Sequence, residues 1–172
     1  MYFFTLVTFN RRPFLVTELA RHCLRQAWQE VQRAYPFDVI ALCLLPDHLH
    51  VLITLPEEDD DNAKRWRAIK VKFTILYLDA GGEDGERSTS RQKRVEAALG
   101  QRRYWQHDIH DDNDRYRHLD YIHYNPVKHN YVSKPAEWYY STFSRYVKNG
   151  YYDNEWGNVE PDEIKKSNIF GE

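Results

Sequence analysis

The order of strand-like and helix-like segments is the feature of this sequence that most restricts its fold. Segments rich in β-branched and aromatic residues alternate with segments whose apolar residues recur every three to five positions. The resulting order is strand, helix, strand, strand, helix, strand, helix, over residues 2–8, 17–34, 37–45, 48–55, 62–79, 102–109 and 111–125. The first six follow the split β-α-β pattern. We therefore predict an α+β fold with a ferredoxin-like antiparallel sheet and its connecting helices on one face.

Turn and capping residues mark the ends of these segments. Thr17 is a suitable N-cap for the first helix, and Pro126 follows the last one. Glycines and charged residues predominate over residues 80–101, which predicts a mobile loop insertion with a short helix near 91–99. We expect one domain over residues 1–150 and a polar, mobile C-terminal tail over 151–172.

Composition excludes several classes of protein. The chain has 172 residues, of which 42% are hydrophobic and 29% charged, and a net charge of −2. These values are typical of a globular protein and exclude a uniformly basic one, although a basic face balanced by acidic segments remains open. Two cysteines cannot form a disulfide framework. No apolar run reaches the roughly 20 residues of a membrane span, and the N-terminus lacks signal-peptide features, so we expect a cytoplasmic protein.

Two histidines alternate with a leucine in the second of the middle strands. Because alternate side chains share one face of a strand, His48 and His50 both point away from the face of Leu49. Two imidazoles so placed can hold one divalent metal ion. A plain pair of histidines is the simpler interpretation, but both lie in an otherwise apolar strand, where an unpartnered polar group is costly. The pair alone leaves both interpretations open.

A second group of polar residues lies on the last helix. Tyr121 and Asn125 are four residues apart and therefore share a face, and His118 lies three residues before Tyr121. Asn125 offers an amide oxygen to a metal ion, and Tyr121 places a phenol next to it. By itself, the pattern favours a buried tyrosine that packs against the sheet, with Asn125 capping the helix.

Taken together, the two stretches resemble a known family. Residues 45–52 read Leu-Pro-Asp-His-Leu-His-Val-Leu, and residues 121–128 read Tyr-Ile-His-Tyr-Asn-Pro-Val-Lys. This combination is similar to the REP-associated tyrosine transposases, which belong to the IS200-like single-strand transposases with a His-hydrophobic-His (HUH) metal motif and one catalytic tyrosine. Further segments that look like the family lie at 8–13, 66–70, 101–107 and 138–143, so the resemblance covers most of the chain.

The resemblance implies a role for each motif residue. His48 and His50 match the metal-binding pair on a central strand, and Asn125 matches the third ligand. Tyr121 matches the nucleophile, whereas Tyr124 lies in the same motif outside the catalytic position. The implied metal ion is Mg²⁺ or Mn²⁺, which would act on the scissile phosphate as a Lewis acid.

The implied reaction is cleavage and rejoining of single-stranded DNA through a 5′-phosphotyrosine. It needs no nucleotide cofactor, in agreement with the lack of a Walker-type loop in the sequence. The phenol must lose a proton, and helix geometry makes His118 a candidate acceptor.

DNA binding requires cations, and despite the net charge they are clustered. The candidate DNA contacts are Arg11, Arg12, Lys70, Arg102, Arg103 and, as a stacking platform, Trp105. Solvated helix faces are the alternative interpretation for many of these charges. The resemblance implies that the partner is single-stranded DNA with hairpins of the repetitive extragenic palindromic (REP) type. The tail over 151–172 is placed to contact DNA or to cover the active site.

Two other functions remain open from the sequence. One is a domesticated hairpin-binding protein without cleavage activity, and the other is a metal hydrolase unrelated to DNA in which Tyr121 is structural. The resemblance favours a monomer, because relatives in this branch complete their sites within one chain, but it leaves a dimer possible. It also implies a bacterial protein associated with the nucleoid and not with membranes.

Overall fold

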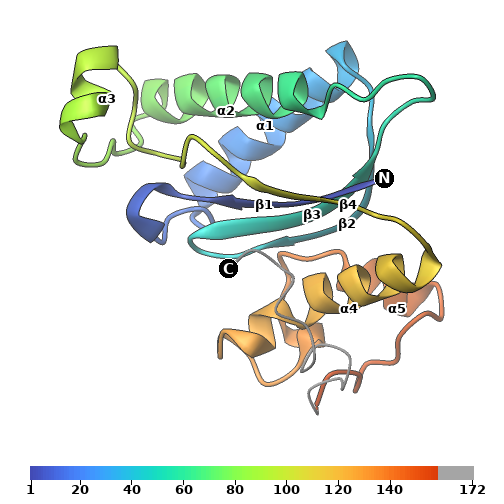
Figure 1. The fold of residues 1–172 in the computed structure, drawn as a ribbon. Coiled ribbons are helices and arrows are strands. Elements are labelled where there is room, and N and C mark those ends of the chain that lie inside the picture. The colour runs from blue at the N-terminus through green and yellow to red at the C-terminus, as the bar shows by residue number, and fades with distance from the viewer. Residues whose placement is uncertain (159–172) are drawn as a thin grey trace.

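A four-stranded antiparallel sheet forms the centre of the computed structural model, which describes residues 1–158 (Figure 1). Its strands are β1 (Tyr2–Val7), β2 (Asp38–Leu44), β3 (His48–Thr54) and β4 (Trp105–Asp108). Their order across the sheet is β2-β3-β1-β4, and all three neighbouring pairs are antiparallel. This is the predicted ferredoxin-like arrangement, with β3 and β1 as the central strands.

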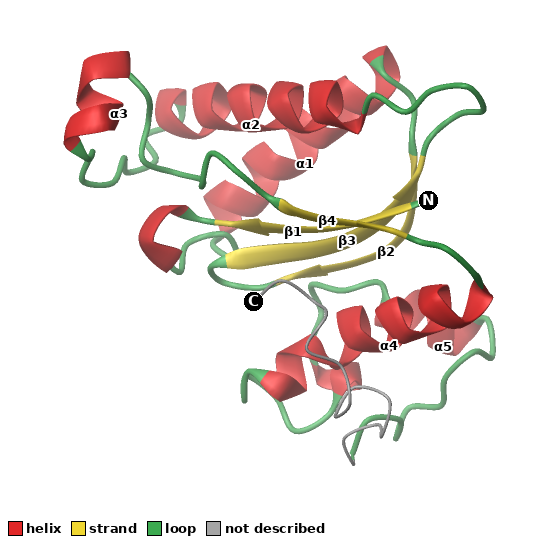
Figure 2. Cartoon of the chain, viewed as in Figure 1, coloured by secondary structure: helices red, strands yellow, loops and turns green. Residues whose placement is uncertain are grey.

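Helices cover both faces of this sheet (Figures 1 and 2). The two crossover helices α1 (Glu18–Ala34) and α2 (Asn62–Asp79) share one face and pack on each other, as predicted. On the opposite face lies α4 (Asp112–Lys128), accompanied by the short α5 (Phe143–Lys148). The strand–helix order does not specify this second layer.

Strand β3 contributes side chains to both layers in alternation. Leu49, Val51 and Ile53 belong to the core that the sheet forms with α1 and α2. Leu52 belongs to the core on the α4 side, together with Leu119 and Ile122 of that helix. The period of two along a strand therefore places His48 and His50 on the α4 face, as expected.

The start of β4 and the end of α4 each differ from the prediction by three residues. Strand β4 begins at Trp105 and not at residue 102, because the carbonyls of residues 101 and 102 accept hydrogen bonds from Lys70 on α2, at 3.0 and 3.3 Å. Helix α4 ends at Lys128 and contains Pro126, which we expected to lie beyond its end. Near a helix terminus, a proline costs only one backbone hydrogen bond, so the helix continues through it.

The segment expected to be a mobile insertion follows a defined path. Its helix α3 spans Thr89–Arg94 and ends where Val95 adopts a left-handed conformation, earlier than expected. Asp84 accepts a hydrogen bond from the backbone of Ala98 at 2.7 Å, and Arg91 donates one to the carbonyl of Gly100 at 2.7 Å. These bonds close the segment on itself beside the end of α2. The two 3₁₀ turns, Phe9–Arg11 and Pro135–Glu137, lie outside this region.

The first residues of the expected tail pack on α4. Tyr152 is buried and donates a hydrogen bond to Asp120 at 2.7 Å, and Trp156 contacts the ring of Tyr124. The rest of that tail, residues 159–172, lies outside the described residues, and so does the role predicted for it. Within residues 1–158, no helix is both long and apolar enough to cross a membrane.

Candidate active site

His50 is fixed by the strand next to it. In the β1–β3 register it lies opposite Thr5, whose hydroxyl is 2.9 Å from His50 Nδ1. The ring of Phe3 stacks on the imidazole at 5.7 Å. His50 and Thr5 are both buried. Thr5 thus engages Nδ1, and the His50 ring lies on the α4 side of the sheet.

His48 is oriented by a carboxylate at the start of the same strand. Its Nδ1 lies 2.6 Å from Asp47 Oδ1, and Arg11 donates to the other oxygen of Asp47 at 2.9 Å. Burial raises the pKa of Asp47, but the bonds from His48 and Arg11 outweigh it, so the pKa lies below its usual range. An ionised carboxylate only accepts hydrogen bonds, so His48 Nδ1 carries a proton and donates to Asp47. This is the usual arrangement of a metal-ligating histidine and its orienting carboxylate.

Helix α4 brings Tyr121 and Asn125 against this pair. The helix is capped by Asp111, whose side chain accepts from the backbone of residue 114, and it buries the face that carries both residues. Asn125 Oδ1 lies 3.4 Å from His48 Nε2, and the Tyr121 ring packs edge-on against His50 at 5.1 Å. His48, His50, Tyr121 and Asn125 are each at most 1% exposed. Four residues predicted from two distant motifs therefore meet at one place.

Lys128 completes this group and was missed by the sequence analysis. Its ammonium group donates to the Tyr121 hydroxyl at 3.2 Å and lies 4.8 Å from the ring centroid. The contact exists because α4 continues through Pro126, which places position 128 two turns after Tyr121 on the same face. His129, the residue after the helix, packs edge-on against His48 at 5.0 Å. The spacing of seven residues between Tyr121 and Lys128 could have indicated this contact. Because we expected the helix to end before Pro126, that spacing was not considered.

His118 points toward the preceding turn of α4. Its Nδ1 lies 2.8 Å from the carbonyl of Asp114 and 3.1 Å from the carboxylate of the same residue. Burial is the main cause that lowers its pKa, so the ring is neutral at neutral pH. Phe3 contacts both rings, that of His118 at 4.7 Å and that of Tyr121 at 6.1 Å. Its role as proton acceptor stays a prediction.

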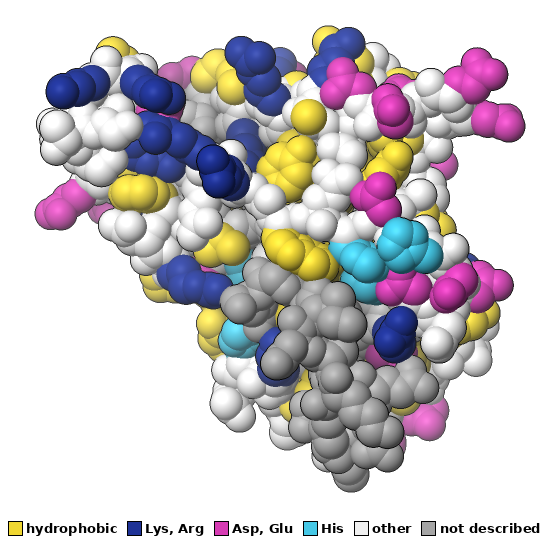
Figure 3. All heavy atoms as spheres, in the orientation of Figure 1, with side chains coloured by type: hydrophobic (Ala, Val, Ile, Leu, Met, Phe, Trp, Pro, Cys, Tyr) yellow, Lys and Arg dark blue, Asp and Glu magenta, His cyan; other side chains and the backbone are white. Residues whose placement is uncertain are grey.

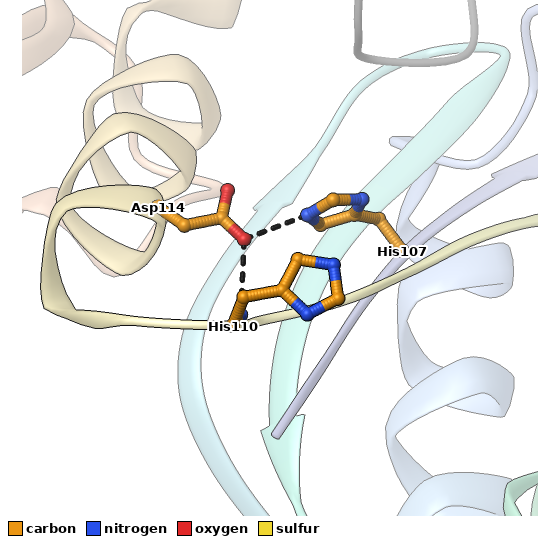
Figure 4. A group of neighbouring side chains, drawn as sticks. All are labelled: His107, His110 and Asp114. Carbon is orange, nitrogen blue, oxygen red and sulfur yellow. Dashed lines mark hydrogen bonds and ion pairs between the residues drawn. The ribbon is translucent and has the colours of Figure 1, made fainter.

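A second group of metal-ligating side chains lies beside His118. It comprises His107, His110 and Asp114, whose ligand atoms all lie within 4.8 Å of one another (Figure 4). Burial raises the pKa of Asp114, but hydrogen bonds from His107 and from the backbone of His110 outweigh it, so the pKa lies below its usual range. The group is compatible with a divalent metal ion. Sequence analysis did not connect its members.

The basic residues predicted to contact DNA separate into two kinds. Arg12 and Lys70 donate to backbone carbonyls of the segment 83–102 and thereby hold it against the body of the protein. Burial, and secondarily the charge of Arg91, lowers the pKa of Lys70 to about 8. Arg11 is 48% exposed but is paired with Asp47.

The remaining candidates lie on or next to β4. Arg102 and Arg103 are exposed, and Arg102 is paired with Glu96 at 2.7 Å. Lys and Arg side chains gather around α3 on the surface shown in Figure 3. A cavity of about 630 Å³ opens between α2 and the segment 96–104, lined in part by Lys70, Arg102 and Tyr104. Trp105 is half-buried and packs against Phe3.

Comparison with known proteins agrees with this geometry. A family model described as "Transposase IS200 like" matches residues 1–77. A Haemophilus influenzae protein, named as a REP-associated tyrosine transposase, is 42% identical over 165 residues, which are 96% of this chain and 92% of that protein. The chain belongs to the REP-associated tyrosine transposases.

Two further proteins are similar to the chain over 90% or more of its length. The REP-associated tyrosine transposase of Escherichia coli is 39% identical over 155 residues, covering 90% of this chain and 83% of its own. A solved structure described as a REP-associated tyrosine transposase bound to a REP hairpin superimposes with a TM-score of 0.79 at 36% identity. It covers 99% of this chain and 90% of its own.

Proposed function

We propose that this chain is a metal-dependent endonuclease and strand transferase that cleaves and rejoins single-stranded REP-type DNA through a 5′-phosphotyrosine. The observation that carries the proposal is the meeting of Tyr121 with His48, His50 and Asn125 on the α4 face of the sheet. A nucleophile that stays attached to the broken strand retains the energy of the phosphodiester for rejoining.

The side chains fit a divalent metal ion held by His48, His50 and Asn125. His48 Nε2 and the amide oxygen of Asn125 lie 3.4 Å apart, so one metal ion could bind both atoms. We propose Mg²⁺ or Mn²⁺ at this position, with Asp47 and Thr5 fixing the two imidazoles. When bound, the ion would polarise the scissile phosphate as a Lewis acid.

The residues of the chain supply the covalent step. The Tyr121 oxygen forms a bond to phosphorus, the bond from phosphorus to the 3′ oxygen breaks, and the strand leaves with a 3′ hydroxyl. A free phenol has a pKa of about 10 and is a poor nucleophile at neutral pH. The Lys128 ammonium at 3.2 Å stabilises the charge that develops on the oxygen as its proton leaves. His118, neutral at neutral pH, is the proposed acceptor of that proton. Because Tyr121 is only 1% exposed, substrate access requires the contacts around it to open.

The proposed partner is a DNA hairpin with an unpaired foot. Support comes from the relative bound to a REP hairpin, and from the cations around α3 and the segment 96–104. The residues that we propose contact phosphate or bases are Arg11, Arg12, Lys70, Arg102, Arg103 and Trp105. All four site residues come from one chain, which favours an active monomer of a single domain. We also propose that it acts on DNA at the nucleoid.

A cleavage assay tests this proposal. The substrates are end-labelled single-stranded hairpins from palindromic repeats of the genome that encodes the chain, incubated with Mg²⁺ or Mn²⁺. We expect a covalent protein–DNA band in the parent and in Tyr124→Phe, and no such band in Tyr121→Phe. Tyr124 is the matched control because it lies in the same motif but contacts Trp156.

The other outcomes overturn distinct parts of the proposal. Loss of the band only in Tyr124→Phe would refute the assignment of the nucleophile. Retention of the hairpin in a native gel without cleavage under either metal would identify a hairpin-binding protein that has lost the reaction. Neither cleavage nor retention would refute the DNA partner.

A further inference from the structure

We propose that His107, His110 and Asp114 form a second metal site, which binds a divalent transition-metal ion such as Zn²⁺ and ties strand β4 to the start of α4. The three side chains come from the end of β4, from the linker after it and from the first turn of α4 (Figure 4). The proposal concerns metal binding at this place and does not depend on the DNA chemistry proposed above.

The carboxylate of Asp114 is the centre of the group. Its Oδ2 lies 2.7 Å from His107 Nε2 and accepts a hydrogen bond from the backbone of His110 at 3.1 Å (Figure 4). Its other oxygen, Oδ1, lies 3.1 Å from Nδ1 of His118. Asp114 itself is buried, whereas His110 is exposed. One oxygen of the carboxylate is therefore held by His118, and the other faces the His107 imidazole and the backbone N–H of His110. Ligands in metal sites are commonly oriented by neighbouring residues in this way.

The kind of donor atom selects the kind of metal. Two imidazoles and one carboxylate suit Zn²⁺ and similar transition metals, whereas Mg²⁺ prefers a set made of oxygens. Zinc–ligand bonds of about 2.0–2.2 Å bring ligand atoms to roughly 3.3 Å from one another in a tetrahedral site. To bind one ion, the ligand atoms of His107 and Asp114, now 2.7 Å apart, must separate slightly, and the most distant ligand atoms, within 4.8 Å, must approach. Rotation of the exposed His110 ring can supply that approach. Three protein ligands leave one position for water.

The position of the group in the fold gives the ion a structural consequence. His107 lies opposite Phe3 in the β1–β4 pairing, and its ring stacks on that of His118 at 4.6 Å. Asp114 lies two turns before Tyr121 on α4. Here β4 is an edge strand of only four residues, joined to α4 by the short linker that holds His110. A metal ion would thus fasten the beginning of α4 to the sheet.

Zinc binding to the full-length protein tests the proposal. Chelator-treated protein is titrated with Zn²⁺ in competition with a chromogenic indicator, and the Co²⁺ form is examined for visible ligand-field bands. We compare the parent with His110→Ala, which removes an exposed ligand and should fold. The control is His22→Ala, which removes an exposed histidine of α1 far from the group along the chain.

The same titrations are repeated in a His50→Gln background, which removes the imidazole of the other candidate metal group. In that background we expect one Zn²⁺ per chain and a zinc-dependent rise in Tm. His110→Ala should weaken binding by more than about 100-fold, beyond the loss typical of residues that merely orient a ligand. His22→Ala should leave both measurements unchanged.

Two results would overturn the proposal. One is that His110→Ala and its parent have the same affinity for Zn²⁺ and show the same zinc-dependent rise in Tm. The other is a Co²⁺ spectrum that is the same for His110→Ala and the parent. Asp114→Asn provides a second test, since it keeps the shape of the side chain and removes its charge. Unaltered zinc binding in Asp114→Asn would refute the role of the carboxylate.

Discussion

The two faces of strand β3 differ in character although their residues alternate along seven positions. On the α1–α2 face, Leu49, Val51 and Ile53 belong to a large apolar core. On the α4 face, His48 and His50 are each held by a specific polar partner and meet polar residues of α4. The contribution of the first face to stability depends on the apolar volume that it buries. The chemistry proposed for the second face depends on the positions of individual nitrogen and oxygen atoms.

This difference separates the energetic roles of neighbouring residues. Apolar packing stabilises the fold in rough proportion to the area buried, and similar side chains can replace one another. An oriented imidazole has no such substitute, because its value lies in the direction of one lone pair. We therefore expect substitutions on the two faces to affect different measurements, even between adjacent residues.

The largest effect is expected for His50→Gln. Glutamine keeps a polar side chain near Thr5 but lacks the imidazole nitrogen proposed as a metal ligand. We expect the rate of formation of the covalent DNA adduct to fall by more than about 100-fold, because residues that only orient a ligand already account for 10–100-fold. The rate is measured by denaturing gel in single turnover with Mg²⁺ or Mn²⁺.

An unfolding titration serves as the control for His50→Gln. If the variant is folded and its adduct forms at the parental rate, His50 is not part of the reaction and the contrast between the two faces fails.

Leu49→Ala should produce the opposite result. Leu49 is 4% exposed and lies between the two histidines, in the core on the other face. Truncating a buried leucine costs about 2–5 kcal/mol in the free energy of unfolding. Urea unfolding measures that loss, and the adduct assay, run below the unfolding transition, should give a rate close to that of the parent. A loss of rate comparable to that of His50→Gln, in protein shown to be folded, would mean that the two faces are not independent.

Lys128→Met tests whether the α4 face extends to the end of the helix. Methionine keeps the length of the side chain and removes the ammonium that donates to the Tyr121 hydroxyl. We expect the adduct to form about 10–100-fold more slowly, somewhat less than the loss of a preorganised donor in a closed active site. Hairpin affinity in a native gel should change little, because one cation contributes a small part of the binding.

The control for Lys128→Met is Lys148→Met, which removes an exposed charge from α5. If both variants lower hairpin affinity and leave the rate with bound DNA unchanged, Lys128 is a phosphate contact and does not assist Tyr121.

Much of the α4 face could be predicted from the sequence, because most of its polar residues lie at regular spacings in a strand or a helix. His48 and His50 follow from the period of a strand, and Tyr121 and Asn125 from the period of a helix, so local geometry gave each pair. Their meeting required the family resemblance, because no local pattern relates residues 77 positions apart. Lys128 could not be predicted in this way, because Pro126 indicates the end of a helix, whereas α4 continues to position 128.

The group of His107, His110 and Asp114 could not be predicted in this way. Its members come from a strand end, a linker and a helix start, and no single period relates their spacing. Only the path of the chain from β4 into α4 brings them together. The same holds for Thr5, which reaches His50 through the register of β1 and β3. Contacts that depend on strand register or on the path of the chain between elements therefore could not be predicted from local sequence patterns.

The smallest expected effect concerns Lys70, on the α2 side of the sheet. Its pKa of about 8 in the folded protein lies below the usual value of about 10.4 for lysine. Between these two values the unfolded chain retains a proton that the folded chain has lost. The contribution of Lys70 to the free energy of unfolding therefore rises with pH over this window. Relative to Lys70→Met, we expect the parent to gain about 1–2 kcal/mol between pH 7.5 and 9.5.

Urea unfolding at the two pH values measures this gain, with Lys93→Met as the control because Lys93 is an exposed lysine of α3. The same pair of variants distinguishes two possible roles of Lys70, which are to hold the backbone of residues 101 and 102 and to contact DNA phosphate. If it only holds the carbonyls of residues 101 and 102, hairpin affinity at pH 7 should be similar in Lys70→Met and Lys93→Met. If it contacts phosphate, the parent should lose affinity as the pH rises through 8, and Lys70→Met should not. A parent whose stability relative to Lys70→Met is flat between pH 7.5 and 9.5 would show that this ammonium is solvated, and would place it with the exposed cations around α3.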